Sequence, residues 1–161
     1  MSIRVGERIP RASLTRLGDG VETVTTDTLF RGRHTLLFAV PGAFTPTCSE
    51  KHLPGYVAHM PDFRKLGIAV ACMAVNDAYV MAAWGASQQV PDDLLMLADG
   101  NAELTRALGL ELDGSGYGMG LRCRRFALYA EDGVIRVLNV EAPGEFRVSN
   151  AETMLEAIGT P

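Results

Sequence analysis

The chain has 161 residues, of which 47% are hydrophobic and 21% are charged, a balance typical of a soluble globular protein. Its formal net charge of -4 and pI near 5.3 give no reason to expect binding to nucleic acid or to an anionic membrane. The longest apolar run, residues 68–75, is too short to span a bilayer, and the N-terminus has no apolar core of signal-peptide length. We therefore expect one domain over residues 1–161, located in the cytoplasm.

The first third of the chain predicts a hairpin, a buried strand and the start of a helix. Residues 13–17 and 21–25 flank the turn signal Gly18-Asp19-Gly20, and a short turn then runs to Phe30. Residues 35–40 form an uninterrupted apolar run that is typical of a buried strand. The sequence Pro-Gly follows this run directly and predicts a turn.

The stretch 41–56, PGAFTPTCSEKHLPGY, follows the buried strand. Thr45 and Thr47 are suited to cap a helix, Pro46 suits its first position, and Cys48 then falls in the first helical turn. Unpaired N–H groups and the helix dipole at that position favour a thiolate over a thiol. A lone cysteine is more often a buried apolar residue. Here the polar neighbours favour a partly exposed nucleophile, and Leu-Pro-Gly at 53–55 predicts an early break in the helix.

The remaining elements alternate between strands and helices. They are a helical piece at 55–66 restarted near Pro61, a strand at 67–75, a helix from Asp77 to about Gly85, a strand at 94–98, a helix from Asn101 or Ala102 to Gly109, a mobile glycine-rich loop at 114–120, strands at 122–129 and 134–140, and a last helix from Ser149. This order predicts an α/β fold with a mixed, centrally parallel sheet and helices on both faces.

The motif P-x-x-x-T-x-x-C, formed by Pro41, Thr45 and Cys48, resembles the active-site motif of peroxiredoxins. The longer string at 41–56 resembles the type-five group of that family, also called type II. The resemblance continues through 75–85, 97–110 and 122–141. It implies a thioredoxin-like fold and a thiol peroxidase. Cys48 would then be oxidised to a sulfenic acid by hydrogen peroxide or a small alkyl hydroperoxide, without a metal or other cofactor.

Three further side chains are candidates for the site. The Thr45 hydroxyl can accept the thiol hydrogen bond or hold a peroxide oxygen, although helix capping alone would explain it. Pro41 can shield the sulfur, although turn formation alone would explain it. Resemblance assigns the active-site arginine to Arg125. If 122–129 is one strand, Arg125 shares a face with Cys123, whereas Arg122 and Arg124 lie on a solvated face.

His52 lies one helical turn after Cys48. His52 could form a metal-ligand pair with Cys48 or act as a general base. For a metal site, no second pair of ligands has suitable spacing. We favour a histidine that supports the site without contacting the substrate.

Recycling of an oxidised Cys48 requires a second thiol. Cys72 lies in an apolar strand, where an inert buried thiol is favoured, but plant type-II members carry a cysteine nearby, so a resolving role stays open. In animal members the resolving cysteine falls near Val148, and residues 142–161 contain no cysteine. We therefore expect an external reductant, either glutathione with glutaredoxin or thioredoxin. The alternatives are a two-cysteine mechanism through Cys72 and a redox-sensing or disulfide-exchange protein, although no C-x-x-C pair is present.

A homodimer is also expected. We expect Phe44, Pro46, Trp84 and Tyr117 to form an exposed apolar rim around Cys48, and such clusters often mark interfaces. The family resemblance also implies pairing around the active site.

Overall fold

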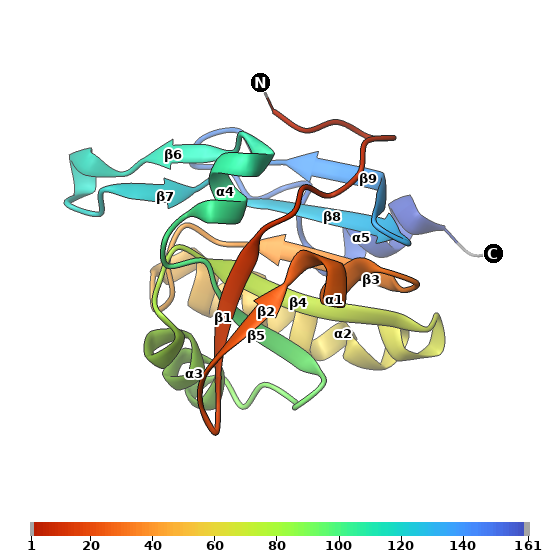
Figure 1. The fold of residues 1–161 in the computed structure, drawn as a ribbon, viewed down its shortest axis with the longest axis horizontal. Coiled ribbons are helices and arrows are strands. Elements are labelled where there is room, and N and C mark those ends of the chain that lie inside the picture. Colours follow the sequence, from red (N-terminus) through yellow and green to blue (C-terminus); the bar gives the residue numbers. More distant parts are fainter. Residues whose placement is uncertain (1, 160–161) are drawn as a thin grey trace.

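A computed structural model describes residues 2–159. Its main feature is a seven-stranded sheet with the order β2-β1-β5-β4-β3-β8-β9 (Figure 1). The strands are β1 (Ser13–Gly18), β2 (Gly20–Thr25), β3 (His34–Ala39), β4 (Ile68–Ala74), β5 (Leu94–Ala98), β8 (Phe126–Glu131) and β9 (Val134–Val140). The three central strands β3, β4 and β5 run parallel, and the outer strands join them antiparallel. The predicted mixed, centrally parallel sheet is therefore confirmed.

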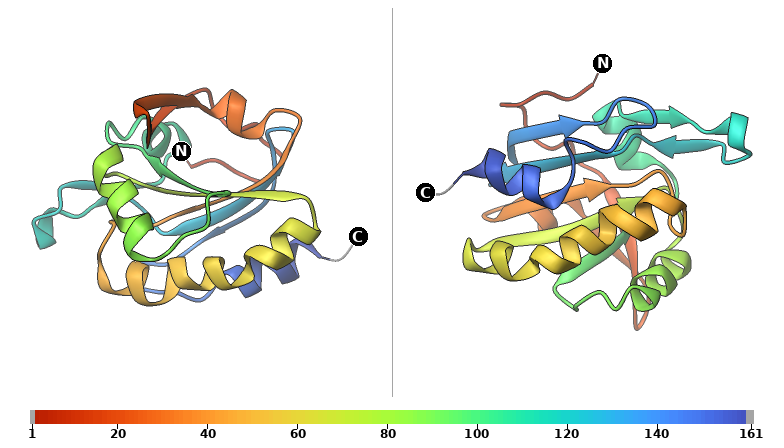
Figure 2. Two further views of the ribbon diagram at one scale, coloured as in Figure 1. Left: turned by 90° about the horizontal axis from the view of Figure 1, so that it is seen from below. Right: turned by 180° about the vertical axis from the view of Figure 1, so that it is seen from behind.

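Helices cover both faces of this sheet (Figure 2). The helices α2 (Leu53–Lys65), α3 (Ala78–Ser87) and α5 (Ala151–Ile158) pack on one face, and α1 (Thr26–Phe30) and α4 (Glu103–Leu108) pack on the other. Strand β3 shows why both faces are apolar, because Leu36 and Phe38 point into one core and Leu37 and Ala39 into the other. Cys48 and Cys72 belong to the core beneath α2.

The helix after β3 is longer than the sequence pattern indicated. A π-helical turn, η1 (Cys48–His52), continues directly into α2, so the predicted break at 53–55 and the restart near Pro61 are both wrong. In η1 the Leu53 N–H bonds the Cys48 carbonyl, five residues back. Pro54 directly follows this π-helical turn, so the helix lacks one N–H donor there and still continues without a break. π-Helical turns within longer helices often occur at functional sites.

The predicted strand at 122–129 is also wrong, because the chain divides there into two strands. Strand β7 (Leu121–Cys123) pairs only with β6 (Glu111–Asp113) in a small second sheet, and β8 begins at Phe126. The backbone between them is held from both sides, since the Arg124 N–H bonds the Leu110 carbonyl and the Glu141 N–H bonds the Arg125 carbonyl. The glycine-rich run between β6 and β7 contains a single 3₁₀ turn, η2 (Ser115–Tyr117).

Other boundaries agree closely with expectation. The β1–β2 hairpin turns at residues 18–20, α3 is capped by the Asp77 side chain, and α4 ends at Gly109 with φ 69°. Helix α3 runs two residues beyond the expected Gly85. No helix within residues 2–159 is long and apolar enough to cross a membrane.

Candidate active site

The register of the sheet brings Cys48 and Arg125 together. Strands β3 and β8 are antiparallel neighbours, with Ala39 opposite Phe126. The segment after β3 therefore leaves the sheet beside the segment that precedes β8. The first segment leads to Cys48 and the second contains Arg125. Two residues 77 positions apart in sequence therefore meet beyond the end of β3 and the start of β8.

The Cys48 sulfur lies between two polar groups. Thr45 Oγ1 is 2.8 Å from Sγ, and Arg125 Nη2 donates to Sγ at 3.1 Å. The residue itself has no exposed surface, so the expectation of partial exposure is wrong. Sγ is instead covered by the groups that contact it. A guanidinium 3.1 Å away favours negative charge on sulfur, because it remains protonated at any working pH.

The Thr45 hydroxyl has two partners and one proton. Oγ1 lies 2.7 Å from the Gly42 carbonyl oxygen, which can only accept. While Thr45 donates to that carbonyl, its oxygen can only accept from a protonated Cys48; to donate to a thiolate, the hydroxyl must turn away from Gly42. The predicted capping role is wrong for Thr47, which makes no side-chain cap bond. Thr45 holds the N-cap position in its backbone, because its carbonyl accepts the first helical bond, from the Ser49 N–H.

The loop before Cys48 has an unusual backbone. Phe44 adopts φ 65°, a left-handed conformation that is rare for a residue with a bulky side chain. Helical bonding then begins with the Ser49 N–H donating to the Thr45 carbonyl. The N–H of Cys48 thus precedes the helical ladder, in the first turn, where amide dipoles favour negative charge.

Arg125 is oriented by His52 and Phe146. Nη1 of Arg125 lies 2.7 Å from His52 Nδ1, and the guanidinium carbon is 5.7 Å from the centre of the Phe146 ring. His52 Nε2 lies 3.1 Å from the Ser149 carbonyl oxygen, so Nε2 carries the proton and Nδ1 accepts from Arg125. Burial and the neighbouring Arg125 lower the pKa of His52 from 6.5 to about 3. His52 therefore supports the site in its neutral form.

The prediction that Arg122 and Arg124 lie on a solvated face is wrong. Arg122 is half-buried and donates to the carbonyls of Met119 and Val75. Arg124 is half-buried and donates to the Glu141 carbonyl. The error follows from the break between β7 and β8, which removes the regular alternation of side chains.

A cavity of about 410 Å³ opens beside Cys48. Its lining includes Pro41, Thr45 and Arg125, of which the last two contact the Cys48 sulfur, and Tyr117 and Met119 from the β6–β7 hairpin. Phe44 and Tyr117 are exposed, as expected of an apolar rim, but Trp84 is fully buried and does not belong to that rim. The Trp84 indole N–H instead donates to Ser49 Oγ and ties α3 to η1.

The remaining cysteines lie in apolar surroundings. Cys72 is fully buried in the middle of β4, and burial and the nearby Cys48 raise the pKa of its thiol well above its ordinary value. Cys123 is buried in the opposite core, and burial raises its pKa to about 12. Among residues 2–159, no arginine or lysine side chain donates a hydrogen bond to the sulfur of Cys72 or Cys123, whereas Arg125 donates one to the sulfur of Cys48.

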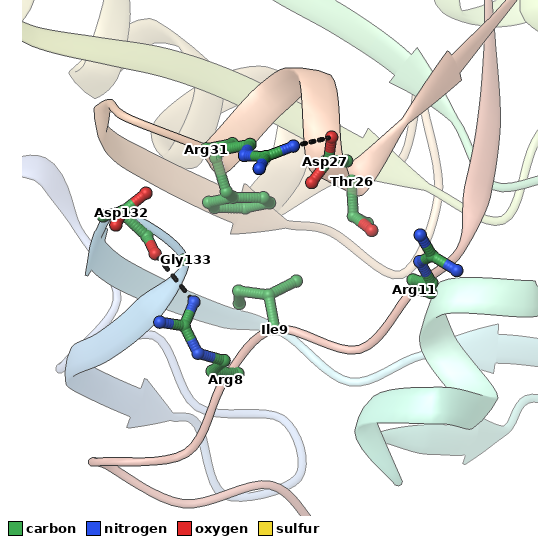
Figure 3. Close-up of a pocket in the computed structure, with 9 residues that line it drawn as sticks. Arg8, Ile9, Arg11, Thr26, Asp27, Arg31, Asp132 and Gly133 are labelled. Carbon is green, nitrogen blue, oxygen red and sulfur yellow. Dashed lines mark hydrogen bonds and ion pairs between the residues drawn. The ribbon is translucent and has the colours of Figure 1, made fainter.

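A second cavity, of about 460 Å³, contains none of the predicted site residues (Figure 3). It lies between the N-terminal segment, α1 and the β8–β9 turn. Arg31 pairs there with Asp27, and Arg8 donates to the Asp132 carbonyl oxygen. Arg8, Arg31 and Asp27 therefore have partners within the cavity wall, and no cysteine lies among the lining residues.

Four residues that contribute to the site were not predicted from the sequence. They are Glu141, Phe146, Ser149 and Tyr56, which act on Arg125 or His52 directly or through one intermediate group. Their contacts link the segment 141–149 to η1 and α2, and no local spacing in the sequence indicates that connection. The one sequence feature that could have indicated this connection is the acidic Glu141, which directly follows the apolar strand β9.

Comparisons of the sequence with known proteins match nearly the whole chain. The sequence model of the Redoxin family matches residues 4–155. Chloroplastic peroxiredoxin-2E-2 of Oryza sativa subsp. japonica is 52% identical over 98% of this chain and 73% of its own length. Chloroplastic peroxiredoxin-2E of Arabidopsis thaliana is 49% identical over 98% of this chain and 70% of its own.

A solved structure extends the likeness to three dimensions. Reduced Prx3 of Vibrio vulnificus in complex with hydrogen peroxide has a TM-score of 0.92 and 49% identity, over 97% of this chain and 99% of that chain. Both the sequence likeness and the fold likeness cover nearly the whole molecule. The chain therefore belongs to the redoxin family and is a peroxiredoxin, a thiol-dependent peroxidase with a thioredoxin-like fold.

Proposed function

We propose that Cys48 is the residue that reduces the hydroperoxide. The observation that carries this assignment is the pair of polar groups, Thr45 Oγ1 and Arg125 Nη2, within 3.1 Å of its sulfur. The thiolate attacks the terminal oxygen of ROOH, the O–O bond breaks, and sulfur becomes a sulfenic acid. The departing RO⁻ takes up a proton and leaves as an alcohol, or as water when the substrate is hydrogen peroxide.

Arg125 and Thr45 stabilise the charge that moves during this step. Negative charge passes from sulfur to the departing oxygen, and the Arg125 guanidinium can contact both with its several N–H donors. The Thr45 hydroxyl and the Cys48 N–H provide neutral donors on the other side. Pro41 lines the same cavity and has no N–H, so it limits contact of water with the sulfur without adding a competing donor.

The substrates we propose are hydrogen peroxide and small alkyl hydroperoxides. The Vibrio vulnificus relative was crystallised with hydrogen peroxide, which supports the smallest of these. The cavity beside Cys48 is larger than hydrogen peroxide needs, and Tyr117, Met119 and Pro143 give it apolar walls. An alkyl group fits such walls better than a charged one.

We propose that an external thiol returns Cys48 to its reduced state. The sulfenic acid condenses with a thiol RSH, releasing water and forming a mixed disulfide, and a second thiol then releases Cys48 as a thiol together with a disulfide. Glutathione with glutaredoxin, or thioredoxin, would supply these thiols. The burial of Cys72 and Cys123 supports this route, since Cys72 is held within the central strand β4 and Cys123 lies in the core on the opposite face of the sheet.

The test is mass spectrometry of the reduced protein after one equivalent of hydrogen peroxide, without added thiol. We expect one oxygen on Cys48, or two after over-oxidation, and a mixed disulfide when glutathione is then added. An intramolecular Cys48–Cys72 disulfide in quantitative yield would instead establish a two-cysteine mechanism. Oxidation at Cys72 or Cys123 with Cys48 unchanged would contradict the assignment of the nucleophile.

We also propose that two copies pair around this cavity, and that the protein works in the cytoplasm. Tyr117, which lines the cavity, is 88% exposed, and Phe44, in the loop before Cys48, is 56% exposed, so two aromatic side chains lack cover from their own chain. Light scattering at tens of micromolar should give the mass of a dimer. Phe44→Ser should shift the mass toward the monomer, and a monomeric mass for the unchanged protein contradicts the pairing.

A further inference from the structure

The segment that follows β9 is organised around a buried carboxylate. Glu141 is 3% exposed and lies directly after β9. Its carboxylate accepts hydrogen bonds from the backbone N–H groups of Arg147, Val148 and Ser149, at 2.8 to 2.9 Å, and from the Ser149 hydroxyl at 2.7 Å. A single side chain therefore fixes the path of the loop back toward α5.

Ionisation suits this role because every contacting group is a donor. Burial alone would raise the pKa of Glu141, but the hydrogen bonds from Arg147, Ser149 and Val148 outweigh it and lower the pKa below its ordinary value. An ionised carboxylate accepts hydrogen bonds at both oxygens. A protonated acid carries a donor O–H on one oxygen, and an amide has a donor NH₂ in place of one oxygen, so neither could accept all of these bonds.

The carbonyl of Ser149 carries this constraint to the helix that contains Cys48. Its oxygen lies 3.1 Å from His52 Nε2 and accepts from the Tyr56 hydroxyl at 2.7 Å. Ser149 is fully buried, so water cannot replace either partner. The position of this carbonyl thus decides which nitrogen of His52 carries the proton.

The tautomer of His52 in turn sets the direction of Arg125. With the proton on Nε2, Nδ1 is an acceptor and receives Arg125 Nη1 at 2.7 Å, while Nη2 of the same guanidinium donates to Cys48 Sγ. With the proton on Nδ1, two donors would face each other and the guanidinium would turn away. The planar shape of the guanidinium means that a turn at Nη1 also displaces Nη2.

We propose that Glu141 is a positioning residue for peroxide reduction, acting through Ser149 and His52 to aim Arg125 at the Cys48 sulfur. This inference rests on the proposed role of Cys48 and Arg125. It adds that the reactivity of the site depends on a carboxylate that bonds residues 147–149 and does not contact the sulfur. It also makes the loop 141–149 part of the active site, although only its ends are buried.

The first test compares Glu141→Gln with Glu156→Gln, which removes the same charge from an exposed position on α5. The rate constant for oxidation of reduced Cys48 by hydrogen peroxide is measured in single turnover. We expect a loss of about 10-fold for Glu141→Gln, as for other small displacements of catalytic groups, and an unchanged rate for Glu156→Gln. Equal rates for both folded variants would overturn the proposal.

The second measurement detects the tautomer directly. In ¹⁵N-histidine-labelled protein, the His52 ring should show a protonated Nε2 and an unprotonated Nδ1, and Glu141→Gln should reduce the population of that form. An unchanged His52 signal beside a slower reaction would overturn the proposed route through histidine. If Glu141→Gln does not fold, Ser149→Ala removes one donor to the carboxylate and should change the same two readouts in the same direction.

A double-variant cycle tests whether the residues act in series. If Glu141 acts through His52, then His52→Phe combined with Glu141→Gln should be no slower than His52→Phe alone. Multiplying losses would show independent actions and contradict the proposal. The unchanged protein serves as the reference throughout: if its Cys48 is not oxidised by peroxide, the proposed function fails, whereas a reactive unchanged protein with insensitive variants refutes only the role of Glu141.

Discussion

Cys48 and Cys72 have equal burial and opposite surroundings. Both side chains have no exposed surface, and both belong to the core beneath α2. The sulfur of Cys48 nevertheless contacts Thr45 and Arg125, whereas Cys72 stands within β4, paired with Phe38 and Met96 on the adjacent strands. Burial therefore does not distinguish the two cysteines. The donors aimed at the sulfur of Cys48 do, and our assignment of Cys48 as the nucleophile rests on them.

The difference follows from where each cysteine lies in its element. Cys72 is within a central strand, whose backbone groups are all used by its neighbours and whose side-chain positions are filled by the core. Cys48 lies where a strand has ended and a helix begins, so backbone donors remain and other loops converge there. The segments that follow β3 and precede β8 meet there, which gives the buried sulfur of Cys48 its two polar partners.

Removing each sulfur in turn gives the sharpest contrast. Cys48→Ser should abolish peroxide turnover, a loss of at least about 1,000-fold, because the hydroxyl is a far weaker nucleophile. Cys72→Ala should leave the first oxidation step unchanged and lower only the free energy of unfolding, through the cavity it creates. Single-turnover peroxide kinetics and denaturant unfolding measure the two effects. A folded Cys72→Ala protein that no longer forms sulfenic acid would reverse the comparison.

Removing the cation tests what makes the Cys48 surroundings different. Arg125→Met keeps most of the side-chain volume and should slow oxidation of Cys48 by about 100-fold to 1,000-fold, as expected for loss of one stabilising donor. Lys51→Met is the control, since it removes an exposed positive charge from η1, the helical turn that contains Cys48. Rates of oxidation by hydrogen peroxide compare the two. Similar losses in both variants would mean that general positive charge, and not the contact to sulfur, supports the reaction.

The neutral donor should have a smaller effect. Thr45→Val removes the hydroxyl at nearly constant shape, and we expect oxidation to slow by about 10-fold, while Thr45→Ser retains most of the rate. The same peroxide assay measures this change. A larger loss in Thr45→Ser than in Thr45→Val would show that the methyl group, and not the hydroxyl, matters.

Acid should weaken the protein through His52. The pKa of His52 is about 3 in the native state and 6.5 ordinarily, so below pH 6.5 the unfolded chain binds a proton that the native state refuses. Stability contributed by the neutral ring is thus fully present above pH 6.5 and is lost as the pH falls toward 3. Between pH 7 and pH 5 the loss from this group is about 2 kcal/mol.

Denaturant unfolding of the unchanged protein and of His52→Gln at both pH values isolates this contribution. The variant should lose less stability on acidification than the unchanged protein. Equal losses would indicate that His52 accepts a proton in the native state. The Cys72 thiol contributes no such pH dependence in this range, because its raised pKa keeps it neutral.

The sequence by itself determined the local features of this protein. Apolar runs identified β3 and β4, turn residues identified the β1–β2 and β8–β9 hairpins, and the P-x-x-x-T-x-x-C motif identified Cys48, Thr45 and Pro41 as one group. These signals are readable because each depends on residues a few positions apart. Residue patterns at that distance report backbone conformation and burial directly.

Only the tertiary structure decided how the sulfur is held. The break between β7 and β8 that frees Arg125 from a regular strand depends on bonds to Leu110 and Glu141, which belong to other segments. The tautomer of His52 depends on a carbonyl 97 positions further along the chain, and the full burial of Cys48 depends on the groups that converge on it. Hydrogen-bond direction is a property of atoms in space, so no pattern along the chain could have shown it.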